Sequence, residues 1–141
     1  MKTLLGAFVS MTIRENVCIM GGYDDLSKSF FDDLKKNKKQ SIFINFNKSK
    51  TKKKNIFNLE VYELKKILNL LKLKNISVII FLGKIDRPNL KHFKLDGEID
   101  KYLPTLYNAY KKGDDFLLKS ILNIFEKYGY LIKSPLDLSA S

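Results

Sequence analysis

A chain of 141 residues with 45% hydrophobic residues, including 10 Phe and 7 Tyr, can bury a hydrophobic core and is too apolar to be intrinsically disordered. Its formal net charge of +11 is compatible with a nucleic acid or an anionic membrane as partner. Only two of its basic residues are arginines, Arg14 and Arg87, and arginine is the usual reader of phosphates and bases, so the composition argues against nucleic-acid binding.

The N-terminal residues 1–15 contain an apolar run that is too short to span a bilayer and lacks a good signal-peptidase site. We interpret them as an N-terminal extension or a peripheral strand of a cytoplasmic protein. Cys18 follows in an apolar stretch, and a lone buried cysteine agrees with a reducing compartment. Because His92 is the only histidine, neither a catalytic thiolate nor a zinc cluster is indicated.

The apolar pattern then alternates between the periods of strands and helices, which is typical of an α/β protein. The predicted strands cover residues 17–22, 41–46, 76–83 and 130–135. The predicted helices cover residues 24–39, 58–75, 98–112 and 113–129. The strand at 76–83 is apolar on both faces and is expected to be central in a parallel sheet. Pro104 should start or kink its helix, and Gly129 should end the last one.

This order predicts a Rossmann-like, three-layer α/β domain over residues 16–135, followed by a tail at 136–141. The sheet should be short and mainly parallel, with about four to five strands and helices on both faces. Ligands of such sheets bind beyond the carboxyl ends of the strands, so candidate binding residues are sought where the predicted strands end.

The first candidates are Gly21 and Gly22, which lie between a predicted strand and a predicted helix. Glycines at this position let the backbone approach a phosphate. The dinucleotide fingerprint is incomplete, because Tyr23, Asp24 and Asp25 follow, and the carboxylates would repel a phosphate that they faced. A tight turn with a capping aspartate explains the stretch equally well.

The second candidates follow the most hydrophobic strand, in the segment Gly-Lys-Ile-Asp-Arg-Pro at 83–88. Gly83 permits close backbone approach, while Lys84 and Arg87 can pair with a phosphate and Pro88 stiffens the turn. The alternative is a solvent-exposed turn with two surface cations.

Two further polar segments have structural explanations and sharper alternatives. Asp114 or Asp115 is expected to cap the last helix, and the alternative is a carboxylate that binds Mg²⁺ or orients a ligand. The lysine-rich run at 48–54 is read as a solvated loop, with attraction to an anionic membrane as the alternative.

Taken together, the segments between residues 60 and 135 resemble the N-terminal half of the LpxI-type UDP-2,3-diacylglucosamine pyrophosphatases. The shared pattern is a helix, a hydrophobic strand into Gly-Lys-x-x-Arg-Pro, a downstream Asp, and Gly-Asp-Asp-x-x-Leu. The matching positions are Gly83, Lys84, Arg87, Pro88, Asp96, Gly113, Asp114, Asp115 and Leu118. One departure is the first turn, where the family has three glycines and this chain has Gly21-Gly22-Tyr23.

The resemblance implies a cytoplasmic hydrolase of lipid A biosynthesis that needs Mg²⁺ and cleaves UDP-2,3-diacylglucosamine to UMP and 2,3-diacylglucosamine 1-phosphate. Peripheral contact with the inner membrane surface is the alternative localisation. The resemblance also implies two domains that hold the lipid between them, with the essential catalytic Asp on the C-terminal one. We therefore expect this chain to lack the catalytic domain, to be inactive alone, and to need a separately encoded partner half. The alternatives are a non-enzymatic module that binds nucleotides or anions, and a basic nucleic-acid or membrane-surface binder.

Overall fold

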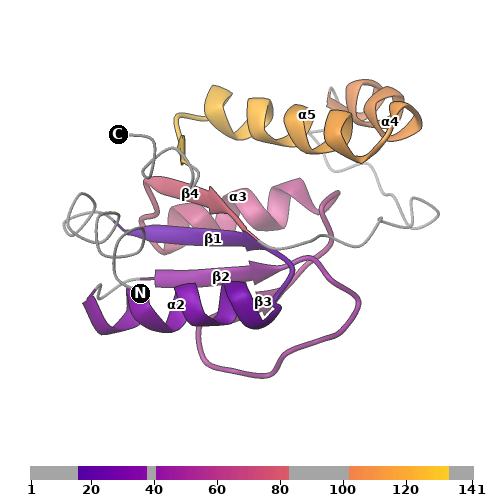
Figure 1. Cartoon of the computed structure of the whole chain (residues 1–141). Helices are drawn as coiled ribbons and strands as arrows, with labels where there is room; N and C mark the ends of the chain where they lie inside the picture. The colour runs from indigo at the N-terminus through magenta and orange to yellow at the C-terminus, as the bar shows by residue number, and fades with distance from the viewer. Residues whose placement is uncertain (1–15, 38–40, 83–101, 134–141) are drawn as a thin grey trace, which may run out of the picture.

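Five parallel strands form one sheet in the computed structural model of the chain, which describes residues 16–37, 41–82 and 102–133 (Figure 1). The strands are β1 (Val17–Gly21), β2 (Ser41–Asn45), β3 (Ile56–Asn58), β4 (Val78–Phe81) and β5 (Leu131–Lys133). The helices are α2 (Asp25–Asn37), α3 (Leu64–Leu73), α4 (Leu103–Lys112) and α5 (Asp114–Lys127). The predicted Rossmann-like α/β class is thus confirmed, while the expectations for 1–15 and 136–141 lie outside the described residues.

The strand order is β3-β2-β1-β4-β5, so the chain builds the sheet outward from β1 in two directions. It moves from β1 to β2 and β3, then crosses back through α3 to β4 on the other side of β1. Right-handed crossovers in opposite directions place their helices on opposite faces of a sheet. β1 is the middle strand of the sheet, and β4, which was predicted to be central, is an interior strand that pairs in parallel with β1 and β5.

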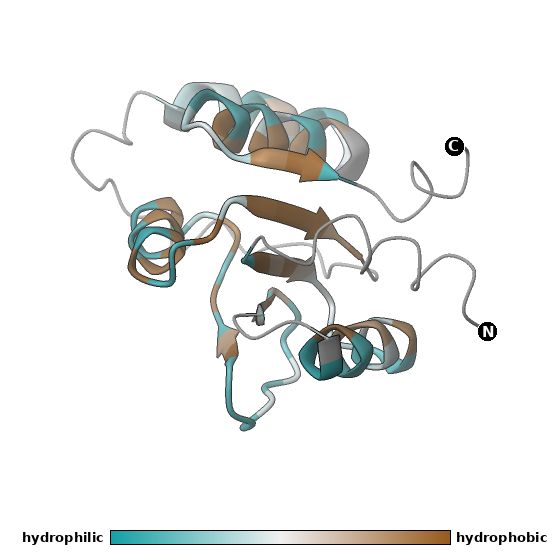
Figure 2. Cartoon of the chain, turned by 90° about the vertical axis from the view of Figure 1, so that its left-hand side faces the viewer, coloured by the Kyte–Doolittle hydropathy of each residue, from teal (hydrophilic) through white to brown (hydrophobic). Residues whose placement is uncertain are grey.

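Apolar side chains on the two faces of the sheet form two separate cores. On one face, Phe30, Phe31 and Leu34 of α2 pack against β1, β2 and β4. The other face is covered by α3, α4 and α5, whose buried residues include Ile67 and Phe125. Figure 2 shows brown strands between helices whose brown sides turn toward the sheet and whose teal sides face outward. The three layers follow from this double-sided burial.

The segment at 56–63 differs most from its prediction, because residues 58–75 were expected to be helical throughout. Instead Ile56–Asn58 forms the short edge strand β3, and α3 begins only at Leu64. Three residues are too few to display a strand period, and Asn58 pairs in register with Asn45 of β2. Tertiary pairing with β2 therefore decides the conformation of this segment.

The ends of α4 and α5 bear on three further expectations. Pro104 lies in the first turn of α4, so it starts this helix and does not kink it. α5 ends at Lys127 with Tyr128 as its C-cap, and Gly129 follows with a φ of 95° and an N–H that donates to the Glu126 carbonyl, which confirms the predicted terminal glycine. The expected aspartate cap of α5 is wrong, because Gly113 occupies the N-cap position and Asp114 and Asp115 are the first two helical residues.

Candidate functional site

The carboxyl ends of β1 and β4 lie side by side at the point where the strand order reverses. Doubly wound sheets bind their ligands beyond the strand ends at such a reversal. We call this rim the carboxyl edge and define it by five residues at or just beyond the strand ends: Gly21, Gly22, Asn45, Asn58 and Leu82. The structure thus brings the predicted glycine turn next to the residue that precedes Gly83.

Gly21 is required by the packing of this edge. The Leu82 N–H donates to the Met20 carbonyl at 3.0 Å, and the Phe46 N–H donates to the Gly21 carbonyl at 2.9 Å, so β1 is held from both sides. A Cβ on Gly21 would lie 1.9 Å from the Leu82 carbonyl oxygen, and the Gly21 φ of 148° is itself unfavourable for other residues. The close neighbour of Gly21 is the backbone of Leu82, just after β4, and the approach of a phosphate to Gly21 stays a prediction.

The turn after Gly22 is closed by an aspartate cap, one of the two readings that the sequence left open. The Ser27 N–H donates to the Asp24 carboxylate at 2.9 Å, and the Asp24 N–H donates to the Ser27 hydroxyl at 2.8 Å. The buried Ser27 hydroxyl also donates to the Gly22 carbonyl at 2.7 Å. A carboxylate therefore occupies the helix terminus where a phosphate would otherwise be favoured.

Sequence reasoning missed two asparagines at the ends of β2 and β3. The Asn45 side chain is fully buried, and its amide donates to the Asn58 side-chain oxygen at 2.9 Å and to the Ser49 carbonyl at 2.9 Å. Its oxygen accepts the N–H groups of Tyr23 and Asn47, each at 3.2 Å. The sequence carries no local signal for this pair, because it depends on the pairing of β2 with β3, in which Asn45 lies opposite Asn58.

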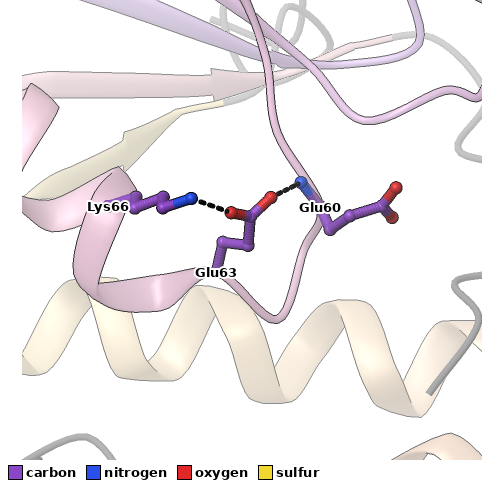
Figure 3. Close-up of polar contacts among 3 residues, drawn as sticks. All are labelled: Glu60, Glu63 and Lys66. Atoms are coloured by element: carbon purple, nitrogen blue, oxygen red, sulfur yellow. Dashed lines mark hydrogen bonds and ion pairs between the residues drawn. The ribbon is translucent and has the colours of Figure 1, made fainter. Parts of the chain in front are cut away.

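Glu63, just before α3, has a pKa below the usual range of a glutamate. Burial by itself raises the pKa of this carboxyl, but the Glu60 N–H, which donates to it at 2.9 Å, and the Lys66 ammonium at 2.9 Å lower it, as does the charge of Lys50 (Figure 3). Both carboxylate oxygens are therefore engaged by their own turn. We assign Glu63 a structural role at the start of α3.

Comparison with known proteins decides the family. The sequence pattern described as the LpxI N-terminal domain matches residues 16–140 of this chain. The chain belongs to the LpxI family. A segment of 71 residues is 38% identical to the UDP-2,3-diacylglucosamine pyrophosphatase LpxI of Caulobacter vibrioides, and this match covers 50% of the chain and 25% of that relative. The resemblance read from residues 60–135 is thereby confirmed at the level of the family.

The remaining residues of the LpxI pattern are placed only in part. Gly83, Lys84, Arg87 and Asp96 lie outside the described residues. Gly113, Asp114 and Asp115 are placed by their backbone, where α4 passes into α5. Because α5 leads into β5, which is parallel to β4, the beginning of α5 lies at the same end of the sheet as the carboxyl edge (Figure 1).

The need for Mg²⁺ that the family resemblance implies stays a prediction for the described residues of this LpxI domain. Among them, no three His, Cys, Asp or Glu side chains lie close enough to hold a metal ion.

Burial raises the pKa of the Cys18 thiol far above its usual value, so this cysteine remains protonated in the core. In the described part of the chain, no helix is long and apolar enough to cross a bilayer.

Proposed function

We propose that this chain is the N-terminal, substrate-contacting half of a UDP-2,3-diacylglucosamine pyrophosphatase. The whole enzyme would act in the cytoplasm, at a step of lipid A biosynthesis, and would hydrolyse its substrate to UMP and 2,3-diacylglucosamine 1-phosphate. Membership of the LpxI family and similarity to the UDP-2,3-diacylglucosamine pyrophosphatase of Caulobacter vibrioides support this assignment.

The observation that carries the proposal is the contact between Gly21 and Leu82 at the reversal of strand order. Leu82 is followed directly by Gly83 and Lys84, and Arg87 comes three residues later. The two cations of the LpxI pattern therefore follow the strand end that forms one wall of the expected ligand crevice. The Asp24 carboxylate caps α2 after β1, so we expect the diphosphate to bind nearer to residues 84–87, which we call the cationic turn.

Each part of the proposed contact set has a distinct chemical role. Lys84 and Arg87 would neutralise the negative charge that accumulates when a pyrophosphate bond is cleaved, and Arg87 could hold two phosphate oxygens at once. Gly21 and Gly22 would leave the crevice free of side chains, and Gly83 would allow the ligand to approach the backbone. Asp114 and Asp115 would orient polar groups of the ligand from the beginning of α5.

Hydrolysis is assigned to the complete enzyme and not to residues 1–141 alone. We propose that a C-terminal half supplies the catalytic carboxylate, that the lipid binds between the two halves, and that Mg²⁺ is needed by the assembled enzyme. No step is assigned to a metal held by the described residues.

The cationic turn is tested by titrating the chain with UMP and with 2,3-diacylglucosamine 1-phosphate. Lys84→Ala and Arg87→Ala are each expected to weaken binding about tenfold to a hundredfold, because each removes a charge-assisted hydrogen bond to phosphate. The control is Lys72→Ala, which removes an exposed lysine from the last turn of α3 and should bind like the parent. Equal affinities in all four proteins would contradict the proposed role of this turn.

The proposal that hydrolysis needs a second half is tested by assaying the purified chain for release of UMP from UDP-2,3-diacylglucosamine in the presence of Mg²⁺. We expect no turnover above the uncatalysed rate, while binding of the reaction products is retained. Sustained release of UMP by the pure chain would show that a second half is not required. Binding without turnover, even after a C-terminal LpxI half is added, would instead support a module that only binds nucleotides or anions.

A further inference from the structure

The loop between β2 and β3 carries the densest positive charge in the described part of the chain. We call residues 47–55 the basic loop; it contains five lysines and no acidic residue. All five lysines are exposed: Lys48, Lys50, Lys52, Lys53 and Lys54. Figure 2 shows this segment as a teal strip that extends away from the brown strands.

The basic loop is fastened to the sheet along its length. The buried Asn45 amide donates to the Ser49 carbonyl, and Asn58 exchanges hydrogen bonds with Thr51 through the Thr51 N–H at 3.1 Å and the Thr51 carbonyl at 3.0 Å. At the far end, the Phe43 N–H donates to the Asn55 carbonyl at 2.9 Å. The backbone is therefore held while the lysine side chains are exposed, so little backbone entropy would be lost when the loop meets a partner.

The charge of Lys50 in the basic loop lowers the pKa of Glu63. The Glu63 carboxylate forms an ion pair with the Lys66 ammonium at 2.9 Å. The Lys53 ammonium lies 5.8 Å from the centroid of the Tyr23 ring, which attaches the loop to the turn before α2.

We propose that the basic loop is a docking surface for an anionic phospholipid bilayer. Five lysines on a held loop match the clusters of four to eight cations that bind anionic lipid surfaces, each worth about 1 kcal/mol near the membrane. Lysines suffice for this partner, because a bilayer surface presents diffuse charge and requires no bidentate geometry. Nucleic acid fits less well, because the loop contains neither an arginine nor an aromatic residue that could stack on a base.

This inference does not depend on the pyrophosphatase assignment, and its test measures no hydrolysis. The full chain is sedimented with vesicles of phosphatidylcholine containing about 30% phosphatidylglycerol, and with vesicles of phosphatidylcholine alone. The loop variant combines three exposed substitutions: Lys50→Gln, Lys52→Gln and Lys54→Gln. The control variant removes the same charge from exposed positions on α2 and α3: Lys36→Gln, Lys65→Gln and Lys72→Gln.

We expect the parent and the control variant to bind the anionic vesicles, and the loop variant to bind them at least about tenfold more weakly. Binding to pure phosphatidylcholine should be negligible, and raising the salt from about 0.05 M to about 0.3 M should release the protein. Thermal melts of both variants, which change only exposed side chains, verify that they are folded.

Three results would overturn the proposal. The first is equal loss of vesicle binding in the loop and control variants, which would mean that net charge alone attracts the protein. The second is binding that does not distinguish the two kinds of vesicle. The third is tighter binding to random duplex RNA than to anionic vesicles at about 0.15 M salt, which would assign the loop to nucleic acid.

Discussion

Gly21→Ala is expected to lower the free energy of unfolding by about 3–5 kcal/mol, a large fraction of the stability of a domain of this size. The added Cβ would lie 1.9 Å from the Leu82 carbonyl oxygen, which belongs to the backbone and cannot rotate away. Relief requires the ends of β1 and β4 to separate, and the hydrogen bond from Leu82 to Met20 would then weaken. Urea-induced unfolding followed by circular dichroism measures the effect.

The matched control is Gly113→Ala. Gly113 has a φ of 129°, similar to that of Gly21, but a Cβ there would have no neighbouring atom within 4 Å. This substitution should therefore cost only the conformational term, about 1–3 kcal/mol. If both variants lost the same stability, the contact of the added Cβ with Leu82 would contribute nothing to the loss. The ends of β1 and β4 would then be packed less closely than the structure shows.

Asn45→Ala is expected to cost about 3 kcal/mol or more and to release the basic loop. The substitution removes both hydrogen bonds donated by the buried amide and leaves the N–H groups of Tyr23 and Asn47 without their acceptor. Amide hydrogen exchange should accelerate at Tyr23 and Asn47, and the urea midpoint should fall.

The stability loss of Asn45→Ala is to be compared with the losses caused by the same substitution at two other asparagines. Asn58→Ala removes fewer hydrogen bonds and should have an intermediate effect. Asn69→Ala changes an exposed residue of α3 and should alter stability by no more than about 0.5 kcal/mol. An Asn45→Ala protein as stable as Asn69→Ala, with unchanged exchange at Asn47, would show that the network does not hold the loop.

The buried elements could be predicted from sequence because their own side chains carry the signal. The strands at 17–21, 41–45 and 78–81 are continuous apolar runs, and α2 repeats its apolar residues at helical spacing. β3 could not be found in this way, because its three residues are held by pairing with β2 rather than by a pattern of their own.

The sequence predicts where the carboxyl edge lies, but not which side chains meet there. The order of elements indicates where parallel strands end, and this rule places Gly21 at the edge together with Leu82. The asparagine pair depends on the register Asn45 to Asn58, which no local feature of the sequence reveals. Choosing Asp114 or Asp115 as the α5 cap failed because Gly113 occupies the N-cap position, one residue earlier.

The reciprocal pair of Asp24 and Ser27 has a consequence for redox chemistry. In sheets of this topology, nicotinamide and flavin dinucleotides place their pyrophosphate on the first helix after β1. Here such a cofactor would have to displace a carboxylate from the Ser27 N–H and then remain beside its negative charge. NADH and FAD are therefore expected to be poor ligands of this domain, although its strand order follows that of dinucleotide-binding sheets.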